Sequence, residues 1–348
     1  MKKTFFWVLL SLFVFSVFSI VLPAAEPVKI IFDTDIGNDV DDVMAMGVIH
    51  ALQNRHECEL LAVTITKDNK YAAPMAELLN RFYGRSDIPV GMVKNGVTKE
   101  DGRYLVPVVE AKNADGFPVF PTVITPENSK NCTDAVVLLR KVLAEQADRS
   151  VVIVQVGFST NLAGLLDTPG DELSPLTGKE LLKHKVTYCS LMAGAFIPQL
   201  AKHKEYNIAC DIPAARKFFA ECPCPVVLSG YEIGEMIQSA AVSQQNGYCY
   251  VKNHPVQLAY KYYRGLENDQ PLFDLTSVLY AVRPGWNYFG LSEPGNVTVN
   301  DDATVVFTPS ENGRFRYLTV TPEQVAAVRE ALCHLASEPP QKQNGWVR

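Results

Sequence analysis

The amino-acid sequence predicts an α/β fold: one domain on an open, mixed, mostly parallel sheet with helices on both faces. Short β-branched, apolar runs alternate with segments of helical periodicity over most of the chain. Such alternation is typical of parallel strands joined by helical crossovers. The sequence shows no internal repeat, low-complexity tract or linker. Because α/β folds of this length often form one unit, a single domain is expected.

The first 25 residues have the pattern of a secretory signal peptide. Lys2 and Lys3 precede a largely apolar run over residues 4–22, and small residues follow at Ala24 and Ala25. We therefore expect a signal peptide at 1–25, a mature domain at 26–348, and a periplasmic or secreted location away from the membrane. The apolar run is about 20 residues long and could span a bilayer, so an uncleaved anchor is the alternative.

The first part of the mature chain predicts a βαβαβ unit. Residues 28–32 form an apolar run that ends in acidic residues, which indicates a buried strand followed by a loop. Residues 42–52 carry apolar side chains at helical spacing, with carboxylates at the start, where they favour the helix dipole. The next expected elements are a strand at 59–66, a helix at 72–83 closed by Gly84, and a strand at 88–90.

The remainder of the chain continues the alternation after a loop. Proline and glycine interrupt the pattern over residues 107–130, which predicts irregular structure. Further strands are expected at 150–156, 186–192 and 225–228. Helices are expected at 132–145, 161–166, 212–220, 234–242, 256–263, 275–282 and 324–336. Residues 296–320 are expected to form two or three strands of an antiparallel edge.

The composition bears on partners and redox chemistry. A formal net charge of -6 and a pI of about 5.6, without a basic block, argue against nucleic-acid binding and favour a small neutral or cationic ligand. Most of the eight cysteines lie in apolar stretches, where a thiol behaves as a small hydrophobe. Cys222-Pro223-Cys224 has the wrong spacing for a zinc knuckle, and no second pair follows it.

Five aspartates lie within ten positions at the expected carboxyl end of the first strand: Asp33, Asp35, Asp39, Asp41 and Asp42. Ligands of open α/β sheets bind at this edge. So many carboxylates repel one another unless a cation or protons neutralise them, and an all-oxygen ligand set points to a hard ion such as calcium or magnesium. Gly37 supplies the backbone freedom of a tight turn. The alternative is a set of solvated loop and helix-cap aspartates.

The acidic loop resembles the N-terminal signature of the inosine-uridine preferring nucleoside hydrolase family. That signature is Asp-x-Asp-Pro-Gly-x-Asp-Asp followed by a helix. Here the sequence is DTDIGNDVDD, with two extra residues and Ile36 in place of the proline. The resemblance continues in order along the chain, through residues 60–66 with Asn69, residues 154–157 with Thr160 and Asn161, residues 191–194 with Glu205-Tyr206-Asn207, and Phe273-Asp274.

The resemblance implies a nucleoside hydrolase-like fold and calcium (Ca2+) as the cofactor. The implied ligands are Asp35, Asp42, Asp274 and the backbone carbonyl of Val156. Asp35 would also act as the general base on a calcium-bound water. The implied reaction is hydrolysis of the N-glycosidic bond of a nucleoside or other riboside, giving ribose and free base, with a role in purine salvage. A homo-oligomer is possible.

The resemblance also implies how the sugar is bound. Asp41 would accept hydrogen bonds from the ribose hydroxyls at C2 and C3, with Asp39 as the alternative because of the two-residue insertion. Asp33 and Asp39 would support the metal loop. The remaining contacts to the sugar would come from Asn69, Met192, Glu205 and Asn207.

Two positions depart from the family pattern. Pyrimidine-active members have a leaving-group histidine directly before the C-terminal calcium aspartate, and this chain has Phe273, which cannot donate a proton but could stack on a base. Gln199 stands where the family has an asparagine in the sugar pocket and could contact the sugar at longer reach. His203 lies in the same segment and is either an acid or an exposed loop histidine.

Two other functions fit parts of the sequence. A non-catalytic, calcium-dependent riboside-binding protein would keep the ribose half of the site and lack turnover, which the Phe273 substitution favours. A magnesium-dependent phosphatase of the haloacid dehalogenase type would account for Asp33-Thr34-Asp35. It would not account for Gly37 or for the rest of the acidic run.

Overall fold

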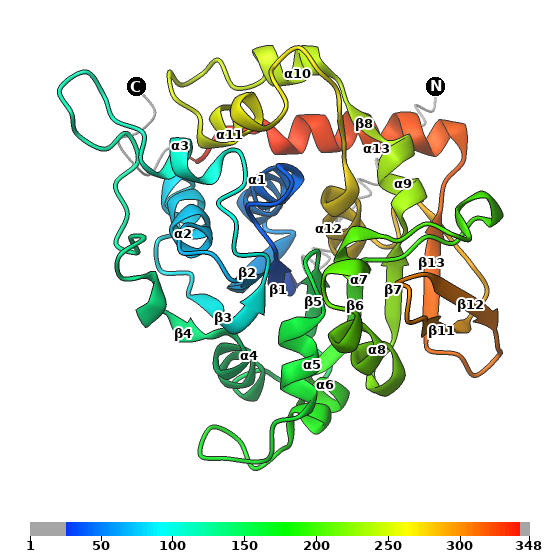
Figure 1. Cartoon of the computed structure of the whole chain (residues 1–348). Helices are drawn as coiled ribbons and strands as arrows, with labels where there is room; N and C mark the ends of the chain where they lie inside the picture. The colour runs from blue at the N-terminus through cyan, green and yellow to red at the C-terminus, as the bar shows by residue number, and fades with distance from the viewer. Residues whose placement is uncertain (1–25, 342–348) are drawn as a thin grey trace, which may run out of the picture.

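The computed structural model describes residues 26–341 (Figure 1). The strands are β1 (Val28–Thr34), β2 (Cys58–Lys67), β3 (Val90–Val97), β4 (Thr133–Asp134), β5 (Val151–Gln155), β6 (Val186–Met192), β7 (Val226–Ser229), β8 (Gln238–Ser239), β9 (Gln270–Pro271), β10 (Gly290–Leu291), β11 (Gly295–Val299), β12 (Val305–Pro309) and β13 (Phe315–Thr319). The α-helices are α1 (Asp41–Asn54), α2 (Ala72–Phe82), α3 (Leu105–Val109), α4 (Ala135–Ala144), α5 (Thr160–Leu166), α6 (Gly178–Lys185), α7 (Tyr206–Cys210), α8 (Ile212–Glu221), α9 (Tyr231–Met236), α10 (Ala241–Asn246), α11 (Pro255–Tyr263), α12 (Phe273–Val282) and α13 (Pro322–Ala336). Two short 3-10 helices are η1 (Ser129–Asn131) and η2 (Pro198–Leu200).

A mixed sheet of 11 strands forms the centre of the molecule. Its order is β12-β11-β13-β7-β6-β5-β1-β2-β3-β4, with β10 paired to β13. From β13 to β4 neighbouring strands are parallel, while β10, β11 and β12 are antiparallel to their neighbours. The predicted fold class, a mostly parallel mixed sheet with an antiparallel edge near the C-terminus, is confirmed.

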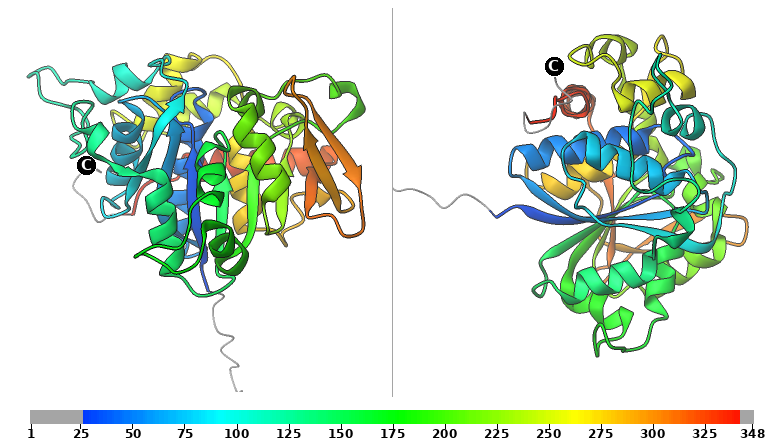
Figure 2. Two further views of the ribbon diagram at one scale, coloured as in Figure 1. Left: turned by 60° about the horizontal axis from the view of Figure 1, so that its bottom comes forward. Right: turned by 90° about the vertical axis from the view of Figure 1, so that its left-hand side faces the viewer.

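Helices cover both faces of the sheet (Figure 2, right). On one face α1 packs against α12 and α13, and on the other α4 packs against α5 and α6. Strand β1 lies in the middle, and Ile30, Ile31 and Phe32 are fully buried, as expected for a parallel strand covered on both faces. Helix α12 contacts both α1 and β6, and all its residues from Asp274 to Val282 are buried.

Two local expectations are wrong for identifiable reasons. Helix α6 was not predicted from the sequence, because its apolar pattern is weak. This helix is started by a capping box in which Thr177 and Glu180 each bond the other's backbone N–H. The single helix expected at 234–242 is interrupted, because Gln238 and Ser239 pair with β9 before α10 begins. Local periodicity carries no information about that distant pairing partner.

Two further elements differ in length from the expectation. Strand β3 continues to Val97, where it pairs again with Lys67 at the end of β2. Helix α3 stands at the beginning of the segment that was expected to be irregular. The predicted signal peptide at 1–25 lies outside the described residues. Among residues 26–341, no helix is both long enough and apolar enough to cross a membrane.

Gly157 allows the end of β5 to approach the loop that follows β1. The backbone N–H groups of Val156 and Gly157 both donate to the carbonyl oxygen of Asp33, at 2.7 and 3.3 Å. A Cβ atom on Gly157 would lie 2.3 Å from Oγ1 of Thr66 and 2.6 Å from the backbone nitrogen of Asp35. The acidic loop and the end of β5 can therefore approach each other this closely only because residue 157 has no side chain.

Gly157→Ala should lower the free energy of unfolding by about 1–3 kcal/mol, because the added methyl group forces the backbone of the acidic loop to shift. Chemical denaturation measures this change. Gly285→Ala is the matched control, since its added Cβ meets no atom within 4 Å and should change the stability by less than about 0.5 kcal/mol. Equal stability of the two variants would contradict the close approach.

Candidate active site

A cavity of about 520 Å³ lies at the carboxyl ends of β1, β5 and β6. Its acidic lining consists of Asp35, Asp39, Asp41, Asp42, Glu100, Glu205 and Asp274. The remaining lining residues are Gly37, Asn38, Gly102, Arg103, Val156, Met192, His203, Lys204, Tyr206, Asn207, Tyr231, Tyr263 and Phe273. The structure thus brings most of the predicted site residues into one cavity, from segments that are far apart in the sequence.

The acidic loop is held in a tight turn between β1 and α1. Gly37 has a φ of 121°, in the region that favours glycine. The backbone N–H of Gly37 donates to the hydroxyl of Tyr104 at 2.6 Å, and that hydroxyl donates to the carbonyl oxygen of Asp39 at 2.8 Å. Helix α1 then begins with Asp41 and Asp42, whose charges favour its N-terminus. Tyr104 therefore fixes the two-residue insertion of the loop.

Three buried carboxylates converge beside this turn. Asp41, Asp42 and Asp274 can each place an oxygen within 4.8 Å of the other two. The backbone N–H of Asp274 donates to Asp41 Oδ2 at 3.1 Å, and the hydroxyl of Thr34 donates to Asp42. Burial, followed by repulsion from neighbouring aspartates, raises the pKa of all three carboxyls well above the usual value. This clustered, buried, all-oxygen set is suited to a hard metal cation.

Asp35 lies next to this cluster and is linked to a buried lysine. Burial raises its pKa to about 6, while the hydrogen bond from Asn38 and the charge of Lys67 act in the opposite direction. Asn38 donates to Asp35 Oδ2 at 2.6 Å, and the ammonium of Lys67 donates to the amide oxygen of Asn38 at 2.6 Å. Lys67 also pairs with Glu100 at 3.0 Å, and its own side chain is fully buried.

Asp33 and Asp39 occupy different sides of the loop. Asp33 lies behind it, outside the cavity lining, and accepts hydrogen bonds from Thr64 at 2.6 Å and Asn161 at 2.8 Å. Burial raises the pKa of Asp33 to about 7. Asp39 faces the cavity and accepts a hydrogen bond from Gln270 at 2.8 Å. Of the two candidates for the ribose contact, Asp41 is the one grouped with Asp42 and Asp274.

A second wall of the cavity is organised by Glu205 and Asn207. The amide of Asn207 donates to the carbonyl oxygen of Val156 at 2.7 Å and to that of Met192 at 3.1 Å. The carboxylate of Glu205 accepts from the backbone N–H groups of Gly194, Asn207 and Ile208, at 3.2, 2.7 and 3.1 Å. It thereby caps α7, and burial raises its pKa to about 7.

Two of the predicted sugar contacts lie outside the cavity lining. Asn69 donates to the carbonyl oxygen of Lys99 and to Asp101, both at 2.9 Å, and accepts from the backbone of Tyr71. Gln199 is exposed in η2. The structure therefore does not bring these two side chains to the other site residues, and their contacts with a sugar stay predictions.

An aromatic wall stands at the start of α12 and α9. Phe273 stacks with Tyr231, with ring centroids 5.3 Å apart, and His203 also packs against Tyr231, with ring centroids 4.1 Å apart. Tyr231 was not predicted as a site residue, although its place directly after the buried strand β7 was a usable signal. Lys67, Tyr104 and Arg103 were not predicted either, because they reach the site from β2 and the segment before α3 and carry no local signal.

Comparison with known proteins places the chain in a family. The sequence matches the family model described as inosine-uridine preferring nucleoside hydrolase over residues 30–330. No curated protein matches it.

Solved structures share the fold at low identity. A plant nucleoside hydrolase is 21% identical, with a TM-score of 0.64, over 90% of this chain and 100% of that chain. A purine-preferring ribonucleoside hydrolase from Gardnerella vaginalis is 18% identical, with a TM-score of 0.64, over 89% and 99%. The type III effector protein XopQ, in complex with adenosine diphosphate ribose, is 16% identical, with a TM-score of 0.62, over 90% and 95%.

The family match begins in β1 and ends in α13, so it includes the acidic loop, Asp274 and the whole cavity. The resemblance and the enzyme class predicted from the sequence are confirmed at this level. The chain belongs to the inosine-uridine preferring nucleoside hydrolase family, whose members are enzymes that hydrolyse N-glycosyl compounds.

Proposed function

We propose that this chain is an exported, calcium-dependent enzyme that hydrolyses the N-glycosidic bond of ribonucleosides and serves purine salvage. The observation that carries the proposal is the buried cluster of Asp41, Asp42 and Asp274 beside Asp35. The cavity of about 520 Å³ suits a nucleoside, because small-molecule sites commonly measure about 300–1,000 Å³. Family membership supports the reaction class.

Calcium fits the donor set better than a smaller or softer ion. The side-chain donors are all carboxylates, and calcium accepts about six to eight oxygens in a flexible arrangement, whereas magnesium keeps several waters. Asp35, Asp42, Asp274 and the carbonyl oxygen of Val156 would hold the ion. When bound, calcium lowers the pKa of a coordinated water and helps to hold the sugar hydroxyls.

Asp35 is the general base in this proposal. It accepts a proton from the attacking water while the water oxygen bonds to the anomeric carbon and the bond from that carbon to the base nitrogen breaks. The hydrogen bond from Asn38 at 2.6 Å fixes the carboxylate in place. Asp41 accepts hydrogen bonds from the two ribose hydroxyls, and this clamp supplies the positioning that makes attack effectively unimolecular.

The leaving base packs against the aromatic wall of Phe273 and Tyr231. An aromatic face favours stacking of a planar base, and neither ring carries a proton donor of the acidity of an imidazolium. The departing nitrogen therefore receives its proton from solvent or from His203, which lines the cavity next to Tyr231. Binding energy that comes mainly from contacts with the sugar, and less from contacts with the base, suits an enzyme that tolerates several leaving groups.

A non-catalytic, calcium-dependent riboside-binding protein is the second candidate. Phe273, which stands where a leaving-group acid would be needed, favours it. The structure of XopQ, a protein of similar fold, was solved with adenosine diphosphate ribose bound. In a binding protein the carboxylate cluster would hold calcium and sugar without turnover. Release of ribose separates the two functions.

Asp35→Asn should reduce ribose release by about 10²–10⁴-fold, because an amide cannot accept the proton of the attacking water. A reducing-sugar assay on purine, pyrimidine and nicotinamide ribosides, with calcium or with chelator, measures the rate. Asp115→Asn removes an exposed loop carboxylate and should leave the rate unchanged. If wild type releases no ribose while its riboside binding requires calcium, the binding protein is the correct alternative.

Calcium should raise the melting temperature of the wild type, and a chelator should reverse the shift. A ligand at 100 times its Kd stabilises the native state by about 2.7 kcal/mol. Asp274→Asn should abolish the shift, and without calcium it should be at least as stable as wild type because one repelling carboxylate is gone. Scanning fluorimetry tests both points, with Asp115→Asn as control and magnesium as the competing ion. An undiminished calcium shift in Asp274→Asn would rule out the ligand assignment.

Lys67→Met should lower kcat by up to about 100-fold, because the amide of Asn38 loses its anchor and Asp35 its fixed orientation. KM should change less, since Lys67 does not line the cavity. Lys99→Met is the matched control, because that lysine is 74% exposed and pairs with Asp68 at the surface. Calcium affinity, measured by titration calorimetry, should fall in Lys67→Met only. Identical kcat and affinity in both variants would show that Lys67 has no part in the site.

A further inference from the structure

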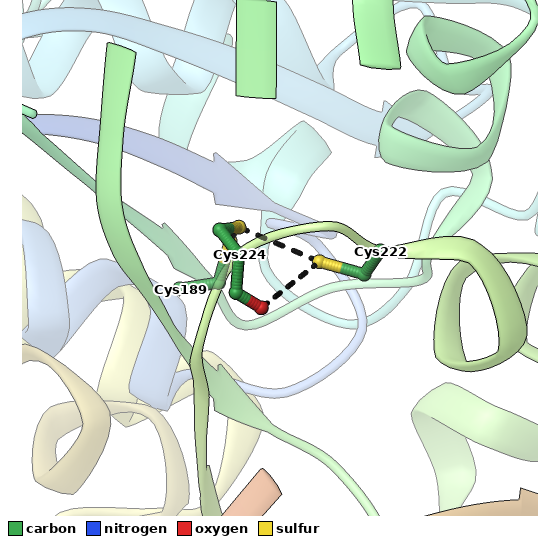
Figure 3. Close-up of side chains that lie close together, drawn as sticks. All are labelled: Cys189, Cys222 and Cys224. Carbon is green, nitrogen blue, oxygen red and sulfur yellow. Dashed lines mark hydrogen bonds between the residues drawn. The ribbon is translucent and has the colours of Figure 1, made fainter. Parts of the chain in front are cut away.

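Three cysteine sulfurs meet in the interior on the sheet face opposite α1 (Figure 3). Cys189 comes from the middle of β6, whereas Cys222 and Cys224 flank Pro223 in the turn between α8 and β7. The sulfur of Cys224 lies 3.4 Å from that of Cys222 and 3.5 Å from that of Cys189. All three sulfurs lie within 4.8 Å of one another, and none of the side chains is more than 2% exposed.

The cluster depends on the pairing of two parallel strands. Cys189 is paired with Val226 in the register of β6 and β7, and its backbone N–H donates to the carbonyl oxygen of Pro225 at 2.9 Å. This pairing brings Cys189 to a two-cysteine turn 33 positions further along the chain. In the sequence, only Cys222 and Cys224 stand close enough to be recognised as a pair of ligands. The third sulfur belongs to Cys189, which lies upstream on the neighbouring strand β6.

The surroundings hold the sulfurs rigidly and keep water out. The cluster is part of an apolar core that includes Phe218, Phe219 and Phe315. Phe219 stacks with Phe315 at a centroid distance of 5.4 Å, which ties α8 to β13 beside the cysteines. Thiolate ligands held in place by a packed core are preorganised for an ion of fixed coordination number.

We propose that Cys189, Cys222 and Cys224 bind one soft, closed-shell metal ion of the Cu(I) type in trigonal coordination. Sulfur ligands select soft ions. The cluster supplies three sulfurs, and the thiol of Cys222 also donates to the carbonyl oxygen of Cys224 at 3.7 Å. Zn(II) in structural sites takes four ligands, so a closed three-sulfur set is better matched to Cu(I).

The separations between the sulfurs favour a metal ion over a disulfide. Three sulfurs at about 2.3 Å from a central ion lie about 4 Å apart, so the observed pairs at 3.4 and 3.5 Å need to move outward by only about half an ångström. A disulfide needs sulfurs about 2.05 Å apart and therefore a larger inward movement in a packed core. It would also leave the third thiol unused.

The ion would link the middle of β6 to the amino end of β7, and both strands run on to the cavity. Strand β6 ends at Met192, and β7 is followed by Tyr231, and both residues line the cavity. Binding replaces the protons of the three thiols and leaves a net negative centre. The cysteine cluster and the carboxylate cluster would bind different ions, because sulfur and carboxylate oxygen have different metal preferences.

The test uses full-length mature protein, purified and reduced under anaerobic conditions and titrated with Cu(I) supplied as its acetonitrile complex. We expect one equivalent of copper by elemental analysis, a sulfur-to-copper charge-transfer band, and an X-ray absorption spectrum with sulfur as the only nearest neighbour. Cys224→Ser should weaken binding at least about 10-fold. Cys249→Ser removes an exposed cysteine outside the cluster and should bind as wild type does.

Several outcomes would overturn the proposal. They are a reduced wild-type protein that takes up no Cu(I), a Cys224→Ser variant that binds with unchanged affinity, and one equivalent of Zn(II) bound in preference to Cu(I). A native disulfide between two of the three cysteines, found by peptide mapping and persisting under the reducing conditions of the titration, would also overturn it. If Cys224→Ser does not fold, the absorption spectrum of the wild-type protein decides the question by itself.

Discussion

The burial of several carboxylates side by side at the end of β1, and the repulsion that this brings, is the constraint on which the rest of the structure depends. Asp41 and Asp42 begin α1, Asp274 begins the neighbouring α12, and their carboxyls have strongly raised pKa values. Two unit charges 4 Å apart repel by about 4 kcal/mol at an effective dielectric constant of 20. Packing around the cluster must outweigh that repulsion in the metal-free protein. The burial of α1 and α12 against each other and the sheet supplies such packing.

The loop between β1 and α1 shows how the chain accommodates its two extra residues without dispersing the cluster. Tyr104 joins the backbone of Gly37 to that of Asp39, so the added length is folded into a turn. The ammonium of Lys67, from β2, donates to Asn38, and Asn38 donates to Asp35, so a positive charge lies close to the carboxylates of the loop. Tyr104 and Lys67 both come from segments outside the signature, so a longer loop can keep its carboxylates together.

The sequence was sufficient for the fold class because the parallel strands are apolar on both faces and the helices between them are periodic. Position at the end of the first strand indicated only the acidic loop as a site. Val156, Met192, Asn207 and Asp274 were assigned to the same site through the resemblance to the family, and the structure places them in one cavity. The sequence was insufficient where a contact is set by a distant partner. Residues 238–239 leave their helix because β9 pairs with them, and Glu205 bonds three backbone N–H groups that only the folded loop brings together.

The two halves of the cavity are built by different physical means, and this difference bears on specificity. The half that we propose to bind sugar and metal is held by backbone groups and buried carboxylates, where small displacements leave polar atoms unpaired at a cost of about 1–3 kcal/mol each. The half that we propose to face the leaving base consists of aromatic side chains, with Phe273 and His203 both packed against Tyr231. Substitutions there change shape and stacking without leaving a buried charge unpaired. In the enzyme that we propose, the leaving group would therefore be free to diverge while the ribose contacts stay fixed. Phe273 lies directly before Asp274 of the carboxylate cluster.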